Sequence, residues 1–292
     1  MDQAKSNART TSRPGPDSGA DSPAHRRVPR HPNTYTPAST MVLAGESKVV
    51  RWDFPASLKT LELVQITDMQ WGHTACNTER VLEYRDWVLK RPNRYMIWTG
   101  DNVDAAHMQS KGTPWDNTGD PQHQVFEFCD VWAPAAHRIL GYVGGNHERR
   151  TLQTFGDLGL LIARELQIPY SRGQQHINIY FGAWQPFRIA QWHGIGAAVT
   201  KGTIAQKLHR FANEGESDLY LMGHHHQPMV LPFWKQRPRG DTVVSIKTIA
   251  ATGSSFLNNW GSYGEVAGYG PTDVLMPRAV IDIEGGFELT LK

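Results

Sequence analysis

The chain has 292 residues and a formal net charge of +2, and 39% of its residues are hydrophobic, which is enough apolar material for a sizeable core. Its two cysteines are too few for a disulfide framework, and no apolar run approaches the roughly 18 residues of a membrane span. The first ten residues lack the apolar stretch of a signal peptide. We therefore expect a soluble, cytoplasmic protein without a membrane partner, and the sequence leaves its oligomeric state open.

Residues 1–40 differ in composition from the rest of the chain. They contain six prolines and almost no large aliphatic side chain, and six basic and three acidic residues give them a net charge of +3. Such a segment cannot bury enough surface to offset the entropy of ordering, so we predict a disordered tail. Residues 41–292, close to neutral, are predicted to form one domain. A neutral body lacks the basic footprint of most duplex-binding domains, which weighs against nucleic acid as the main partner.

Strands and helices alternate along this domain. Hydrophobic patterns predict strands at 61–66, 95–98, 139–143, 177–181, 187–192 and 219–222, and helices at 77–91, 122–132, 155–166 and around 204–211. Further strands are predicted at 243–250, 279–283 and 287–291. This order of elements indicates an α/β layered domain.

Polar clusters follow five of these strands directly. The clusters are 67–73, 99–104, 144–148, 193–194 and 223–226, and they are rich in Asp, Asn, His and Gly. Ligands of open α/β sheets gather outside the carboxyl ends of strands, so the five clusters can converge on one site. Carboxylate, carboxamide and imidazole groups suit divalent first-row metal ions, and two ions about 3.5–4 Å apart need a bridging carboxylate. The pattern therefore favours a metal centre.

The order of the motifs, Asp-x-(His), Gly-Asp, Gly-Asn-His-Glu, His-Gly and Gly-His-x-His, resembles that of the calcineurin-like metallophosphoesterases, from about Leu61 to Gln227. The resemblance implies a four-layer α/β/β/α sandwich with two mixed sheets. It also implies a hydrolase that cleaves a phosphomonoester or phosphodiester with two divalent ions as cofactors. We expect Mn²⁺, with Zn²⁺ and Fe²⁺ as alternatives.

The resemblance also implies a role for each matching residue. Six would be metal ligands: Asp68 and His226 for the first ion, Asn146, His193 and His224 for the second, and Asp101 as the bridge. His147 would bind no metal, but would face the scissile phosphate and protonate or stabilise the leaving oxygen. His225, between two ligands, is expected to point away, because successive side chains of an extended chain face opposite sides.

The first motif departs from the family pattern, because Gln70 stands where the family has histidine. We expect Gln70 to be a ligand through its amide oxygen, since its spacing matches. His73, three residues later, or water are the alternatives. An oxygen-richer first site would shift preference toward Mn²⁺ and away from Zn²⁺.

Other polar residues near the motifs have simpler interpretations. Asp104 is expected to be a cap or to support a ligand, and Glu148 to complement a helix dipole. Arg149 is a candidate for contact with the substrate phosphate. Trp234, in the cationic and aromatic segment 233–239, is a candidate for stacking on a base, and the alternative for that segment is an exposed hairpin loop.

Two other functions fit parts of the sequence. A metal-dependent nuclease acting on DNA or RNA would use the same metal core, and segment 233–239 mildly favours it. A non-catalytic module that binds a partner protein would keep the fold, but would be expected to lose His147 or several ligands. Only Gln70 departs from the pattern, so hydrolysis of a phosphate ester is the favoured function.

Overall fold

The computed structural model describes residues 46–110, 113–182, 186–198, 200–260, 265, 270, 272–284 and 286–292. The predicted tail, residues 1–40, lies outside this part of the chain. None of the helices in the described ranges combines the length and the apolarity that a membrane span requires.

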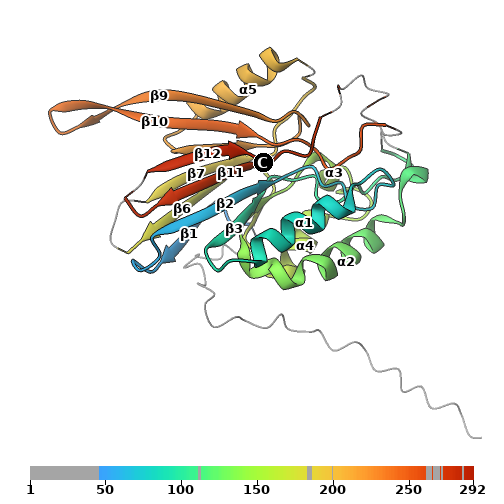
Figure 1. Cartoon of the computed structure of the whole chain (residues 1–292). Helices are drawn as coiled ribbons and strands as arrows, with labels where there is room; N and C mark the ends of the chain where they lie inside the picture. Colours follow the sequence, from blue (N-terminus) through green and yellow to red (C-terminus); the bar gives the residue numbers. More distant parts are fainter. Residues whose placement is uncertain are drawn as a thin grey trace, which may run out of the picture.

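Two six-stranded sheets form the centre of the molecule (Figure 1). The first has the order β1 (Val49–Phe54), β6 (Gln175–Phe181), β7 (Phe187–Trp192), β8 (Leu219–Met222), β10 (Thr242–Thr252) and β9 (Met229–Arg239). The second has the order β12 (Phe287–Leu291), β11 (Pro277–Asp282), β2 (Thr60–Ile66), β3 (Arg94–Trp98), β4 (Ile139–Val143) and β5 (Tyr170–Ser171). Both mix parallel and antiparallel pairs: β2, β3, β4 and β5 are parallel, as are β7 and β8, whereas β2 with β11 and β6 with β7 are antiparallel.

Helices cover the outer faces of both sheets. The second sheet packs against α1 (Thr78–Leu89), α2 (Pro121–Trp132) and α4 (Leu158–Leu166), and the first against α5 (Lys201–Asn213). The short helix α3 (Asn146–Arg149) and two 3-10 turns, 114–116 and 133–138, complete the described helices. The predicted four-layer arrangement of helices, two mixed sheets and helices is confirmed.

Side-chain alternation along the strands produces this layering. In β2, Leu61 and Leu63 pack in the core between the sheets, whereas Val64 and Ile66 pack against the helices. Successive side chains of a strand face opposite sides, so a strand buried on both faces reads as a continuous apolar run. This is why these strands were predictable from hydrophobicity alone.

Several element boundaries differ from the prediction by one to three residues. The helix expected from Phe155 begins at Leu158, because the Asp157 side chain accepts a hydrogen bond from the Leu160 amide and caps the helix there. Segment 233–239, for which a loop was an alternative, belongs to strand β9. Leu231 and Phe233 pack toward α5, and β9 pairs with β10 along its full length.

Candidate metal centre

The candidate ligands lie in the turns directly after strands, at one end of the sandwich. Seven non-glycine residues in the described part of the chain have a positive φ, and five of them are candidate ligands. These five are Asp68, Gln70, Asp101, His224 and His226, with φ between 48° and 75°. L-residues avoid this left-handed region, so surrounding contacts must hold the backbone there. Such strain concentrates at functional sites, which points to this edge of the sheets.

Two glycines allow the turns to approach one another. A Cβ atom at Gly100, where φ is +92°, would lie 2.6 Å from the Gly145 nitrogen and 2.8 Å from Nδ1 of His193. A Cβ at Gly145 would collide with the Asp101 carboxylate. The motif glycines are therefore required for the close contact between three candidate ligand segments.

One group of ligand atoms surrounds Asp101. Asp101, His193 and His224 each offer an atom within 4.8 Å of the others. Nε2 of His193 lies 3.2 Å from Oδ2 of Asp101 and 3.0 Å from Oδ1 of Asn146. The Nδ1 atom of His193 is 2.7 Å from the Thr99 carbonyl, to which it donates. In the neutral imidazole, that bond keeps the proton on Nδ1 and leaves the Nε2 lone pair available, which is the tautomer that a metal ligand needs.

A second group surrounds Asp68, which is fully buried at the end of β2. Its Oδ2 accepts hydrogen bonds from the Thr67 hydroxyl and from the His224 amide at 3.0 Å. Its Oδ1 lies 3.2 Å from Nε2 of His226, yet accepts no hydrogen bond from any described residue. The buried Oε1 of Gln70 has no such bond either. A buried acceptor without a donor costs free energy, so these oxygen atoms fit a site for a divalent cation.

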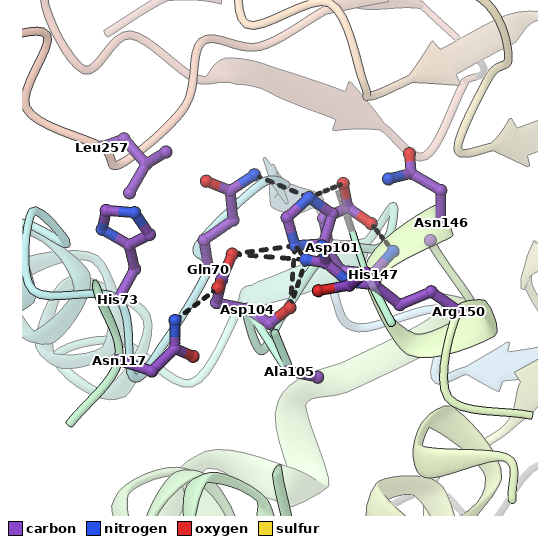
Figure 2. Close-up of polar contacts among 12 residues, drawn as sticks. Gln70, His73, Asp101, Asp104, Ala105, Asn117, Asn146, His147, Arg150 and Leu257 are labelled. Atoms are coloured by element: carbon purple, nitrogen blue, oxygen red, sulfur yellow. Dashed lines mark hydrogen bonds and ion pairs between the residues drawn. The ribbon is translucent and has the colours of Figure 1, made fainter. Parts of the chain in front are cut away.

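Gln70 and His73 lie differently relative to the other candidate ligands. Figure 2 shows the Gln70 amide between His73 and the group formed by Asp101 and His147. Nε2 of Gln70 is 3.4 Å from Nε2 of His147. His73 lies on the far side of Gln70, and its Nδ1 accepts a hydrogen bond from the Ala75 amide at 3.0 Å. Gln70, not His73, therefore extends toward the other candidate ligands.

His147 lies beside the candidate ligands, and Asp104 contacts the Nδ1 side of its ring (Figure 2). Its Nε2 is 3.7 Å from Oδ2 of Asp101, and its Nδ1 is 3.0 Å from Oδ1 of Asp104. Asp104 also accepts bonds from Asn117, at 2.8 Å, and from Arg150. Burial alone would raise the pKa of Asp104, but the bond and charge of His147 and the charge of Arg150 lower it to about 2. Asp104 thus remains a carboxylate that orients the imidazole.

Glu148 fastens the turns after β3 and β4 together. This fully buried carboxylate accepts hydrogen bonds from the backbone amides of Asp101, Asn102 and Gly145, at 3.2, 2.7 and 2.9 Å. The Tyr142 hydroxyl donates a fourth at 3.0 Å. Burial and the nearby Asp101 charge raise the pKa of Glu148. Glu148 was expected to complement a helix dipole. It also holds the turn that carries Asp101, the candidate bridging ligand.

Three remaining candidates lie outside the cluster. Arg149 donates from Nε to the Gly145 carbonyl at 3.1 Å, so it sits at the edge of the site. His225 is buried, and burial lowers its pKa to about 3. Trp234 is 68% exposed on the hairpin of β9 and β10, opposite Lys247, and this hairpin runs away from the candidate ligands (Figure 1). The structure therefore does not bring Trp234 to the site.

The pKa of His193 makes the metal-free protein sensitive to pH. Burial alone would lower this pKa, but the Asp101 carboxylate raises it from 6.5 to about 9. A raised folded-state pKa contributes stability that is present below pH 6.5 and is lost as the pH rises to about 9. We expect urea unfolding of chelator-treated protein to show a loss of up to about 3 kcal/mol across that interval.

Divalent metal should abolish this loss, because a bound ion takes the place of the proton. The variant His193→Asn is the control, and its metal-free form should be less dependent on pH in this range. An equal dependence in both proteins would contradict the assignment of the effect to His193.

Comparisons with known proteins found distant structural likeness only. No family model matches the sequence, and neither does the sequence of any curated protein. Among solved structures, a predicted phosphoesterase from Streptococcus pneumoniae TIGR4 aligns over 80% of this chain and 98% of its own, with 15% identity and a TM-score of 0.34. The NAD nucleotidase of Haemophilus influenzae aligns over 79% of this chain and 49% of its own, with 12% identity and a TM-score of 0.38. GAP50 of Plasmodium aligns over 80% and 84%, with 11% identity and a TM-score of 0.36.

Proposed function

We propose that this protein hydrolyses a phosphate ester with two divalent metal ions held at the ends of β2, β3, β4, β7 and β8. The observation that carries the proposal is the convergence of two buried carboxylates, Asp68 and Asp101, with imidazoles 3.2 Å from each. Buried acceptors in the same place have no described hydrogen-bond donor. Ions bound there would supply Lewis acidity and a nucleophile from water near neutral pH.

Asp101 and His147 have different roles in the proposed reaction. Asp101 contacts His193 on one side and lies near His147 on the other, so it is placed to bridge the two ions. His147 keeps Nδ1 bound to Asp104, which leaves Nε2 facing the centre. Burial alone would lower the pKa of His147, but the Asp101 and Asp104 carboxylates raise it and favour an imidazole that is protonated on both nitrogens. In the proposed reaction, this imidazolium gives its Nε2 proton to the leaving oxygen as the ester bond breaks, and Nδ1 keeps the proton that it donates to Asp104.

The direct test is reconstitution. Protein stripped with a chelator would receive Mn²⁺, Zn²⁺ or Mg²⁺, and each form would be assayed with p-nitrophenyl phosphate, bis(p-nitrophenyl) phosphate and single-stranded DNA. We expect metal-dependent turnover of at least one small ester. Turnover of DNA alone would support the nuclease alternative. Two bound ions without turnover of any substrate would support the non-catalytic module.

Gln70 should set the metal preference. An amide oxygen at this position favours Mn²⁺, whereas imidazole suits Zn²⁺. We expect Gln70→His to increase the ratio of Zn²⁺ to Mn²⁺ affinity at least about tenfold, as measured by chelator competition. His73→Gln is the matched control and should leave the ratio unchanged, since His73 points away from the cluster. A response from His73→Gln instead of Gln70→His would reassign the ligand.

A further inference from the structure

A buried amide links the two sheets beneath the candidate metal centre. Gln65, in β2, is 1% exposed. Its Nε2 lies 2.7 Å from the Thr99 hydroxyl, at the end of β3 in the same sheet, and 2.8 Å from the Met222 carbonyl, at the end of β8 in the other sheet. A carbonyl oxygen only accepts, so the atom facing Met222 must be the NH₂ group. Both amide hydrogens are therefore used in fixed directions.

Both partners of Gln65 lead directly to candidate ligands. Thr99 precedes Asp101 by two residues, and its carbonyl accepts the Nδ1–H bond of His193. Met222 precedes His224 by two residues. Gln65 is not a candidate ligand itself. Through Thr99 and Met222 it is linked to all three members of the cluster around Asp101. The Asp68 carboxylate is held by the Thr67 hydroxyl and, among the described residues of that cluster, only the His224 amide donates to it.

Burial of the Gln65 amide destabilises the fold unless the hydrogen bonds that it donates compensate. Gln65 shares a face of β2 with Leu61 and Leu63, which pack in the core between the sheets, and its Oε1 accepts no hydrogen bond from the described residues. An unpaired buried acceptor destabilises the fold, whereas an apolar side chain of the same size would avoid that cost. The two bonds donated by Nε2 are therefore what the residue contributes here.

We propose that Gln65 is a positioning residue that sets the geometry of the Asp101, His193 and His224 cluster, and with it the affinity of the second metal site. The proposal rests on the proposed function. Residues that orient metal ligands typically change affinity 10- to 100-fold when they are replaced. Gln65 would act through Thr99 and Met222 without touching the ion or the substrate.

The test compares Gln65→Met with Trp52→Phe in the full chain. Methionine matches the length of glutamine but donates no hydrogen bond. Trp52 is also buried, and its Nε1 donates across the sheets to the Leu140 carbonyl of β4 at 2.9 Å, a bond that phenylalanine cannot make. Its strand β1 carries no candidate ligand. Binding of Mn²⁺ would be followed by the EPR signal of the free ion. We expect two sites in the wild type, with one site weakened about 10- to 100-fold in Gln65→Met only.

The outcomes separate the two proposals. Wild-type affinities in Gln65→Met, or an equal loss in Trp52→Phe, would overturn the role of Gln65. If circular dichroism shows that Gln65→Met does not fold, Thr99→Val removes one acceptor and keeps the carbonyl that holds His193; unchanged Mn²⁺ affinity in that variant would equally overturn the role. Failure of the wild type to bind Mn²⁺, Zn²⁺ or Mg²⁺ would overturn the proposed function, and the inference with it.

Discussion

The variant Asp101→Asn is expected to lose both bound metal and activity, with kcat/KM reduced about a thousandfold or more. Asp101 is 1% exposed, lies 3.2 Å from Nε2 of His193, and accepts the amide of His147 at 2.9 Å. An amide has the same shape but no charge, so it cannot neutralise two neighbouring cations. Several kcal/mol of electrostatic stabilisation would be lost, and each 1.4 kcal/mol is about tenfold in rate.

Metal content and turnover should fall together in this variant. The measurement is metal analysis by mass spectrometry beside kcat/KM for the ester that the wild type hydrolyses. Asp53→Asn is a suitable control, because Asp53 is an exposed carboxylate of β1 that pairs with Arg51. An Asp101→Asn protein that keeps two ions and full activity would rule out the bridging role.

His147→Ala is expected to lower kcat about 100- to 10,000-fold while leaving metal content nearly unchanged. His147 is held by Asp104 beside the ligand cluster, and its Nε2 faces the centre without belonging to the group around His193 and His224. Removal of a proton donor slows the departure of the leaving group, but it leaves the ions in place.

The leaving group provides the sharper measurement. An ester whose alcohol has a high pKa needs a proton at departure, whereas p-nitrophenolate does not. The loss in His147→Ala should therefore be larger for a phenyl ester than for a p-nitrophenyl ester. His209→Ala, at an exposed histidine of α5, should retain wild-type rates for both esters. Equal losses for both esters, or loss of metal, would count against a proton donor at position 147.

The layered fold and the edge that holds the candidate site could be predicted from the sequence. Mostly apolar segments such as Leu61–Ile66 identify buried strands, and hydrophobic residues at helical spacing identify the covering helices. The motifs begin within two residues of the strand ends, so the local order along the chain already places them at one edge. These features depend on neighbours in sequence, which is why patterns reveal them.

Which polar side chains contact one another is visible only in the packed structure. The spacing of the first motif favoured Gln70 over His73, but it could not show that Gln70 extends toward His147. Nor could it show that Asp104 bonds to His147, or that Glu148 bonds to the turns after β3 and β4. The same holds for Trp234, whose aromatic and cationic neighbours suggested a binding loop although it lies on a strand that leaves the site. The bond from Gln65 to Met222 joins residues 157 positions apart. Such contacts depend on how two sheets pack and on strand register, and hydrophobic periodicity contains no information about either.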